Sequence, residues 1–333
     1  MGSYKLLTKP NFTEKKTIII IPKKGDKISF VNDNIIVKNT GNKTKFQYTC
    51  HKIFLIYIVG GFSLTTGIIE KSKKFGFSIC FLTAGFKFYE SLNYTIRGNF
   101  ILVKKQYTFD FSNEIARKII INKLQNQIKA LKQTRDNDIE TTINKLEKYI
   151  LDISKLESKD TSIQKYMGFE GLGAKVYYNK LFNNLEWNGR RPRIKDNIIN
   201  LLLDIGYTIL FNYIDAMLSI YGFDCYKGNL HQEFYNRKSL TCDMIEPFRV
   251  IIDLKVRKMY NLKQIKEENF ICFRNSYNIN YKSDINYAYE FIKEIDSYSI
   301  CIFEYIRDYY RWFMKFSDFS NFNNFPMASL IKN

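Results

Sequence analysis

The sequence predicts an α+β protein, with a β-strand-rich N-terminal domain over residues 1–103 and an α-helical C-terminal domain over 104–333. The first hundred residues hold short segments rich in Ile, Val, Phe and Tyr, which are typical of strands. Near residue 104 the apolar residues change to a spacing of three and four, which is typical of helices. A length of 333 residues fits about two domains of ordinary size.

The N-terminal strands are expected to be short and separated by turns. One helix should interrupt them over 67–75, with Thr65 or Thr66 as its N-terminal cap and Gly76 at its C-terminal end. Thr83-Ala84-Gly85 should form the turn of a hairpin. The predicted strands are 17–21, 27–30, 34–37, 46–49, 53–59, 77–82 and 86–89.

The C-terminal part should form a helical bundle. Residues 113–131 and 139–153 predict a helical hairpin, and a further helix should run from Thr161 or Ser162 to Phe182. Residues 197–220 are apolar nearly all round, which predicts the central helix of the bundle. More helix is expected over 287–316. The Asn-rich, aromatic tail 317–333 should be either loosely ordered or ordered by a partner.

The charge points to a polyanionic partner. Lys and Arg number 51 against 33 Asp and Glu, so the formal net charge is +18. Such an excess favours nucleic acid binding, although a bias towards AT-rich codons would also supply Lys. A hydrophobic content of 45% argues against disorder.

Membrane insertion and disulfide bonding are both disfavoured. The best candidate for a span, 53–69, is interrupted by Gly and hydroxyl residues, and the N-terminus lacks the apolar stretch of a signal peptide. We therefore expect a cytoplasmic protein. The six cysteines form no CxxC pair, which favours buried free thiols over a disulfide framework or a zinc knuckle.

Histidine chemistry has two candidates, His51 and His231. His51 begins a buried-looking strand, whereas His231 lies in a Gly- and Asn-rich connection, where functional residues often occur. A lone histidine in a loop is also a common surface or capping residue. His231 is the better candidate for a functional role.

Asp243 and Glu246 would share a helix face with Arg249 at successive spacings of three. The pair could hold a cation, or Glu246 could form an ordinary ion pair with Arg249. Pro247 predicts a kink or a new helix start at Glu246, because the residue before a proline avoids the helical conformation.

Glu170 lies beside Gly171 and Gly173 within a predicted helix. Glycines reduce helix stability, so we expect them where another backbone comes close. A carboxylate at such a tight crossing must be paired or bound to metal. Together Glu170, His231 and Glu246 would suit Mg²⁺ or Mn²⁺ better than zinc.

Basic residues flank these candidate ligands and could contact DNA phosphates. Each basic run alone is more often a solvated surface. The candidate DNA-binding residues are Arg190, Arg191, Arg193, Arg237, Lys238 and Arg249.

Four stretches follow one another along the C-terminal part: EGLGAKVYY (170–178), RRPRIKDNIINLLLDIGYTIL (190–210), YGFDCYKGNLH (221–231) and SLTCDMIEPFR (239–249). In wording and order they resemble a known family, the CRISPR-associated protein one endonucleases and integrases of spacer acquisition. The resemblance extends to 59–88 and 122–131 and covers nearly the whole chain outside the tail.

The resemblance implies a β-rich dimerisation domain and a helical catalytic domain that holds one divalent metal. By motif position the metal ligands fall on Glu170, His231 and Glu246, and Asp243 falls on an acidic position that assists them. Arg249 matches the arginine of the EPFR motif. Tyr177 and Tyr178 could stack on strand ends, but plain core packing is favoured.

The implied activity is metal-dependent insertion of protospacer DNA into a CRISPR array, by attack of a 3′-hydroxyl on a repeat phosphodiester. The implied partners are double-stranded DNA, a second copy of the chain and CRISPR-associated protein two. Two alternatives remain open: a non-catalytic DNA-binding scaffold of the adaptation complex, and a general metal-dependent nuclease.

Overall fold

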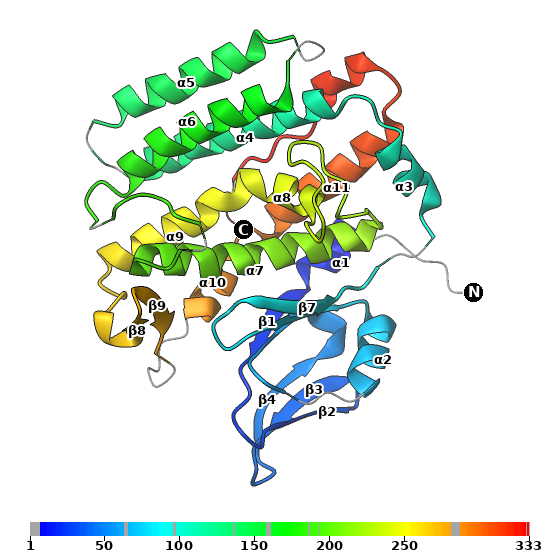
Figure 1. Ribbon diagram of the computed structural model, residues 1–333. Helices are drawn as coiled ribbons and strands as arrows, with labels where there is room; N and C mark the ends of the chain where they lie inside the picture. Colours follow the sequence, from blue (N-terminus) through cyan, green and yellow to red (C-terminus); the bar gives the residue numbers. More distant parts are fainter. Residues whose placement is uncertain are drawn as a thin grey trace.

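The structure is a computed structural model, and it describes residues 7–332 except 63–65, 96–97, 135, 137, 158–160, 186, 193, 281–286 and 331. A strand-rich N-terminal part lies beneath a larger assembly of helices, which confirms the α+β prediction (Figure 1). The described strands are β1 (Lys16–Ile20), β2 (Lys27–Val31), β3 (Asn34–Lys38), β4 (Thr44–Thr49), β5 (Ile53–Val59), β6 (Ser78–Leu82), β7 (Phe88–Leu92), β8 (Phe270–Phe273) and β9 (Ser276–Ile279).

The helices fill most of the remaining chain. The described α-helices are α1 (Lys9–Thr13), α2 (Thr66–Phe75), α3 (Phe100–Tyr107), α4 (Ser112–Gln133), α5 (Glu140–Ser154), α6 (Ile163–Leu181), α7 (Ile198–Tyr221), α8 (Ser239–Ile245), α9 (Arg249–Asn261), α10 (Tyr287–Asp296) and α11 (Ser299–Lys315). Short 3₁₀ turns are η1 (Cys50–Lys52), η2 (Glu246–Phe248), η3 (Glu267–Asn269) and η4 (Phe319–Asn324).

The main sheet of the N-terminal part has the strand order β1-β5-β6-β7. Strands β1, β5 and β6 run parallel, and β7 closes the edge antiparallel to β6. Every residue of β5 is buried, as expected for a parallel strand covered on both faces. The antiparallel sheet β2-β3-β4 turns at Asn32 and Asp33, whose positive φ angles of 48° and 59° suit a tight hairpin.

The predicted helical bundle is present. Helices α4, α5 and α6 pack against one another, and α7 runs through the centre as its all-round apolar sequence predicted (Figure 1). Among the described residues, α7 is the helix long and apolar enough to cross a membrane by length and composition, but 83% of that stretch is buried inside the protein. The burial is that of a core helix.

The C-terminal region has the helix predicted over 287–316 but differs from prediction in its tail. The stretch 287–316 is two helices, because the chain leaves the helical path at Ser297 and Tyr298 between α10 and α11. The tail is held by its own chain, so both expectations for it were wrong over its described part. Asn122 accepts from the backbone N–H of Ala328 at 2.8 Å and donates to its carbonyl at 2.9 Å. Helices α1 and α3 and the β8–β9 hairpin were not predicted from the sequence.

Buried polar contacts join the strand-rich part to α7. The Tyr57 hydroxyl on β5 donates to the carbonyl of Ile209 at 2.6 Å. Asp215 of α7 accepts from Asn93, which follows β7, at 2.6 Å and from Lys238 at 2.8 Å. These bonds fix the strand-rich part against the helix that carries the connection to His231.

The six cysteines are free thiols, as the spacing predicted. Cys50, Cys80 and Cys225 are buried, whereas Cys272 is exposed. The burial prediction therefore holds for only part of the set.

Candidate active site

A close crossing of α4 and α6 brings Glu170 to the site. A Cβ atom added at Gly173 would collide with the Leu124 side chain of α4, so this glycine permits the close approach that the sequence predicted. Gly171 has open space around it and plays no such part. Glu170 lies one turn before Gly173, and its side chain, 29% exposed, contacts Lys123 of α4.

Lys123 links two of the predicted ligands. Its ammonium group forms an ion pair with Glu170 and a second with Glu246, where Nζ and Oε2 are 2.6 Å apart. The side chains of Lys123 and Glu246 are only 7% and 4% exposed. Burial disfavours the charged form and lowers the pKa of Lys123, but Glu246 and Glu170 outweigh it and hold that pKa above its usual range.

Pro247 lies at the predicted break, but Glu246 itself keeps helical backbone angles of φ −54° and ψ −44°, contrary to the expectation for a residue before proline. Helix α8 ends at Ile245, the 3₁₀ turn η2 carries Glu246, and α9 begins at Arg249. The side-chain amide of Asn126 donates to the carbonyl of Pro247 at 3.0 Å, which ties the turn to α4. Burial raises the pKa of Glu246, but Arg249, Lys123 and His231 outweigh it and lower the pKa to about 2. Glu246 is therefore an anion at neutral pH.

Asp243 holds the loop that presents His231. Its buried carboxylate accepts from the backbone N–H groups of Asn229, Leu230 and His231. Because an ionised carboxylate only accepts, Nδ1 of His231 donates to Asp243 Oδ1 at 2.8 Å, and Nε2 is the nitrogen left for a ligand. His51 instead lies on the surface near Asp33, 4.0 Å away.

Arg249 is held between a carboxylate and an aromatic ring. Its Nε donates to Glu246 Oε1 at 2.9 Å, which is the ion pair that the sequence predicted. Glu246 is also the carboxylate predicted to hold a cation. The guanidinium lies 4.8 Å from the centre of the Tyr207 ring, and that of Arg190 lies 5.3 Å from it. Arg190 also pairs with Asp204 at 2.6 Å.

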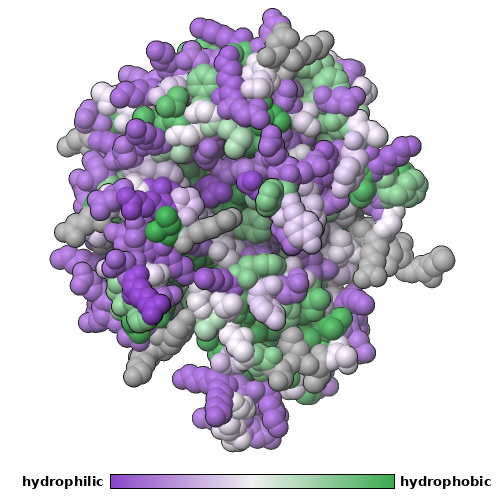
Figure 2. Space-filling view, in the orientation of Figure 1, coloured by the Kyte–Doolittle hydropathy of each residue, from purple (hydrophilic) through white to green (hydrophobic). Residues whose placement is uncertain are grey.

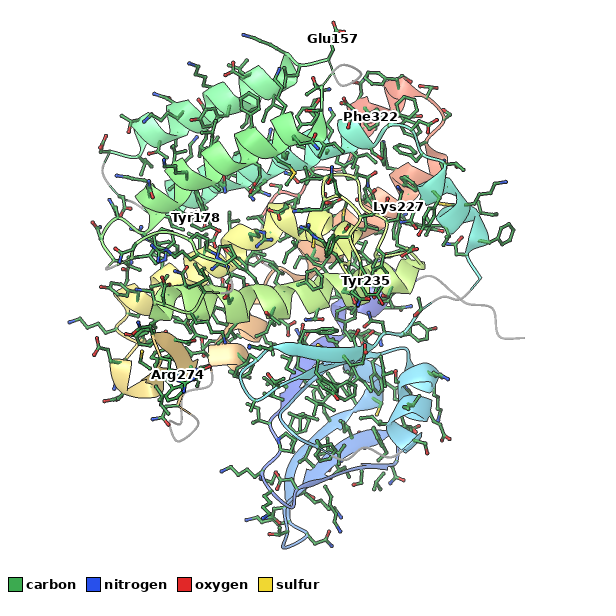
Figure 3. All side chains as sticks on the ribbon, viewed as in Figure 1. Glu157, Tyr178, Lys227, Tyr235, Arg274 and Phe322 are labelled. Atoms are coloured by element: carbon green, nitrogen blue, oxygen red, sulfur yellow. The ribbon has the colours of Figure 1, made fainter. Side chains whose placement is uncertain are left out.

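Tyr177 and Tyr178, in the stretch 170–178, pack in the core. Tyr177 is buried and donates to Asp253. The hydroxyl of Tyr178 on α6, labelled in Figure 3, lies 2.6 Å from that of Tyr207 on α7. Tyr207 also donates to Asp253. Plain core packing was the favoured prediction for Tyr177 and Tyr178.

The other candidate DNA-binding residues have different surroundings. Arg191 is exposed and pairs with Asp196 at 2.8 Å, and Arg237 is exposed in the loop after His231. Lys238 is half-buried by its pair with Asp215 and by the Phe88 ring, 5.5 Å from its Nζ. Arg193 lies outside the described residues.

The residue types fit a divalent metal, but their side chains do not lie close enough together to coordinate one. Glu170 and Glu246 already share one cationic group, and His231 contributes to the lowered pKa of Glu246. Within the described part of the chain, no three His, Cys, Asp or Glu side chains lie close enough together to hold a metal ion. Lys123 stands between the two carboxylates where a metal would need their oxygens.

A comparison with protein families shows which family this chain belongs to. The family described as CRISPR associated protein Cas1 matches residues 19–292 of the chain. The chain belongs to the Cas1 family. Glu170, His231, Asp243 and Glu246 all lie within the matched residues.

Curated Cas1 relatives support the assignment. The chain is 30% identical over 229 residues to the CRISPR-associated endonuclease Cas1 1 of Thermodesulfovibrio yellowstonii, covering 65% of this chain and 71% of the relative. It is 34% identical over 183 residues to the CRISPR-associated endonuclease Cas1 of Leptospira interrogans, covering 50% and 70%.

Solved structures share the fold. A Cas1 protein from Thermotoga maritima has a TM-score of 0.74 at 18% identity, covering 91% of this chain and 98% of its own. A casposase bound to integration product has a TM-score of 0.75 at 20% identity, covering 95% of each chain. A chain of a Cas6-RT-Cas1–Cas2 complex has a TM-score of 0.76 at 18% identity, and our Cas1-family chain spans 37% of that longer chain.

Two features of this Cas1-family site were missed from sequence alone. Lys123 looks like an ordinary lysine on an amphipathic helix, since its partners are far away along the chain. Asp253 sits in a helix of mixed polarity, and only the fold places the Tyr177 and Tyr207 hydroxyls against it. The stretch NKLQNQIKAL (122–131) resembles the family, and this resemblance is the sequence feature that could have pointed to Lys123.

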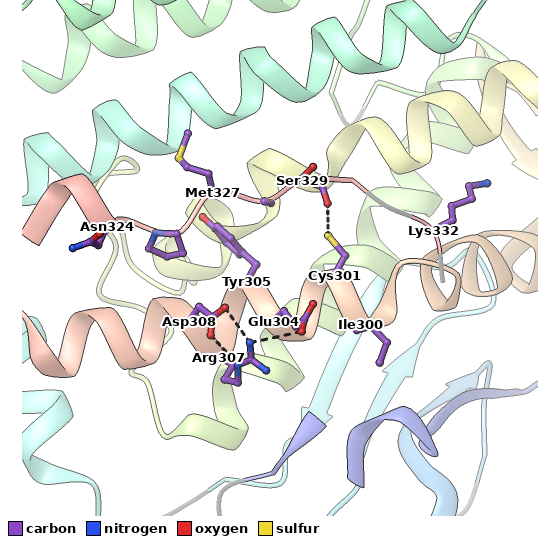
Figure 4. Close-up of a pocket in the computed structure, with 12 residues that line it drawn as sticks. Ile300, Cys301, Glu304, Tyr305, Arg307, Asp308, Asn324, Met327, Ser329 and Lys332 are labelled. Atoms are coloured by element: carbon purple, nitrogen blue, oxygen red, sulfur yellow. Dashed lines mark hydrogen bonds and ion pairs between the residues drawn. The ribbon is translucent and has the colours of Figure 1, made fainter. Parts of the chain in front are cut away.

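The cavity between α11 and the C-terminal segment is separate from these residues (Figure 4). Its volume is about 570 Å³, and none of the candidate ligands is among the described residues that line it. Arg307 pairs there with Asp308 at 2.8 Å and faces Glu304 at 3.7 Å. The charges of this cavity are therefore largely satisfied by one another.

Proposed function

We propose that this chain is the integrase of CRISPR spacer acquisition, and that Glu170, His231 and Glu246 hold its divalent metal, Mg²⁺ or Mn²⁺. The observation that carries the proposal is the convergence of two carboxylates on one cationic group beside an imidazole fixed by Asp243. Membership of the Cas1 family supports it, as does the likeness in fold to a casposase bound to integration product.

The proposed reaction is a transesterification. The 3′-hydroxyl of a protospacer fragment attacks a phosphorus atom of the repeat, a new P–O bond joins the two DNAs, and the bond to the repeat 3′-oxygen breaks. The attacking hydroxyl loses its proton, and the departing oxygen gains one to become a 3′-hydroxyl. A divalent metal at this site would supply charge to the scissile phosphate and activate the attacking hydroxyl.

The protein's own groups prepare the site for this chemistry. Glu246 is ionised at neutral pH and needs no deprotonation before it binds a cation. Asp243 fixes the His231 ring through Nδ1 and leaves Nε2 for a ligand, as a carboxylate does for many metal-binding histidines. Arg249 would hold its guanidinium beside Glu246 for contact with a DNA phosphate.

The proposed partners are double-stranded DNA, a second copy of the chain and a Cas2 protein. The net charge of +18 supports a DNA partner. Hydrophilic side chains cover much of the face over α4, α5 and α6, while apolar side chains gather over the strand-rich part, where a protein partner could pack (Figure 2). The Cas2 partner is proposed from the Cas6-RT-Cas1–Cas2 complex that shares the fold. A cytoplasmic location would place the protein with these partners.

The test is a joining assay with labelled duplex, a supercoiled plasmid that carries the repeat, and Mn²⁺ or Mg²⁺, with and without the Cas2 partner. We expect joined product from the wild type and none from Glu170→Ala, while Glu268→Ala, an exposed carboxylate on η3, stays active. A folded Glu170→Ala variant that still joins DNA would overturn the proposed site. Cutting without joining would favour a general nuclease, and binding without either would favour a scaffold.

A further inference from the structure

Lys123 takes the place of a cation between the two carboxylates. Its ammonium contacts Glu170 and Glu246 at once, and the group is almost fully buried. Glu246 uses its second oxygen, Oε1, for Arg249. Lys123 and Arg249 therefore occupy both oxygens of Glu246, and Lys123 also binds Oε1 of Glu170.

The local charges balance without a metal. Lys123 and Arg249 supply two positive charges, and Glu170 and Glu246 supply two negative ones. A divalent cation added to this neutral group would leave an excess of positive charge in a buried place, which is costly. Two cations also cannot share oxygens at contact distance without strong repulsion.

We propose that Lys123 is a built-in substitute for the divalent metal, and that the metal binds only when the lysine side chain moves out. The inference rests on the proposed function in taking Glu170 and Glu246 as metal ligands. The four-carbon stem of lysine has rotatable bonds throughout, so the ammonium can leave while α4 stays in place. Lys123 thereby holds the two carboxylates together and weakens metal binding by competition.

The first experiment measures Mn²⁺ binding to the full chain by electron paramagnetic resonance, without DNA. Removal of the competing ammonium in Lys123→Met should lower the Mn²⁺ dissociation constant by about tenfold or more. Lys129→Met is the matched control, because Lys129 lies on the same helix, is exposed and contacts only Ser329 in the described structure, at 3.1 Å. An unchanged or weaker affinity in a folded Lys123→Met variant would overturn the proposal.

The second experiment uses the wild type, so it does not depend on the folding of a variant. Lysine side chains labelled with ¹³C at the ε position are followed by NMR while Mg²⁺ is added, and Lys123→Gln assigns the signal. We expect Mg²⁺ to shift the Lys123 signal and to leave the Lys129 signal in place. A Lys123 signal that stays unchanged once the site is saturated would contradict displacement.

A failed inference can be distinguished from a failed function. If His231→Ala loses Mn²⁺ binding while Lys123→Met binds like the wild type, the metal site stands and displacement is wrong. If His231→Ala and Glu170→Ala bind Mn²⁺ like the wild type, the ligand set itself is wrong.

Discussion

Glu246 and Asp253 are both buried carboxylates, yet their pKa values move in opposite directions. Burial raises both. Glu246 contacts the cations of Arg249 and Lys123, and its pKa falls to about 2. Asp253 accepts from the hydroxyls of Tyr207 and Tyr177 and feels Arg249 and Arg190 more weakly, so burial prevails and raises its pKa to about 6.

Asp253 therefore predicts an unusual pH dependence of stability. Because its folded pKa lies above the ordinary value of 3.8, its protonated form stabilises the fold below about pH 4, and this contribution is lost as pH rises through 6. Relative to Asp253→Asn, the free energy of unfolding of the wild type should fall by about 2 kcal/mol between pH 4 and 7. Urea unfolding at several pH values measures this. Parallel pH profiles for the two proteins would contradict it.

At the scale of elements, the crossing of α4 and α6 sets the distance between Lys123 and Glu170. Gly173 lies against Leu124 at this crossing, whereas Gly171 faces open space two residues away. The two glycines of one motif therefore have different physical roles.

Alanine substitutions should separate these roles. Gly173→Ala forces a methyl group against Leu124 and should destabilise the fold by about 1–3 kcal/mol. Gly171→Ala should stabilise it by about 0.5–1 kcal/mol, because alanine favours the helix. Thermal unfolding of both variants tests the pair, and equal effects would show that the crossing does not depend on Gly173.

At the scale of the whole molecule, the C-terminal tail completes the helical core. Phe325 is 5% exposed and its ring lies 4.9 Å from that of Trp312 on α11. Phe319 lies in the same tail but is 49% exposed. The tail closes an aromatic cluster that would otherwise face water.

This packing predicts that the tail stabilises the isolated chain. Phe325→Ala should lower the free energy of unfolding by about 3 kcal/mol, because it leaves a cavity beside Trp312. Phe319→Ala should cost less than about 1 kcal/mol. Both are measured by urea unfolding without any partner protein. A negligible effect of Phe325→Ala would mean that the tail adds little until a partner binds.

The predictable features of the molecule were those with a local cause. Pro247 dictates a break beside Glu246, Gly173 a close crossing, and the apolar run of 197–220 a central helix, all within a few residues of their effect. The packing of the tail and the ion pairs of Lys123 depend on contacts with distant elements. For example, Asn122 and Ala328 are 206 residues apart. Hydrophobic periodicity carries no signal for such pairings.

The candidate ligands were predicted from sequence motifs and residue chemistry together. The structure adds the contacts that fix their side chains. His231 was preferred to His51 because of its loop, and the structure gives that loop an anchor in Asp243 that His51 lacks. The domain boundary at residues 103 and 104 and the metal itself stay predictions.

One comparison tests the central claim most directly: DNA joining by His231→Ala and by His51→Ala on a repeat-bearing supercoiled plasmid with Mn²⁺. The two variants remove the two histidines of the chain, one beside Glu246 and one on the surface. We expect His231→Ala to keep its fold and lose joined product by at least about a hundredfold, while His51→Ala joins like the wild type. Joining at the wild-type rate by a folded His231→Ala variant would contradict the account.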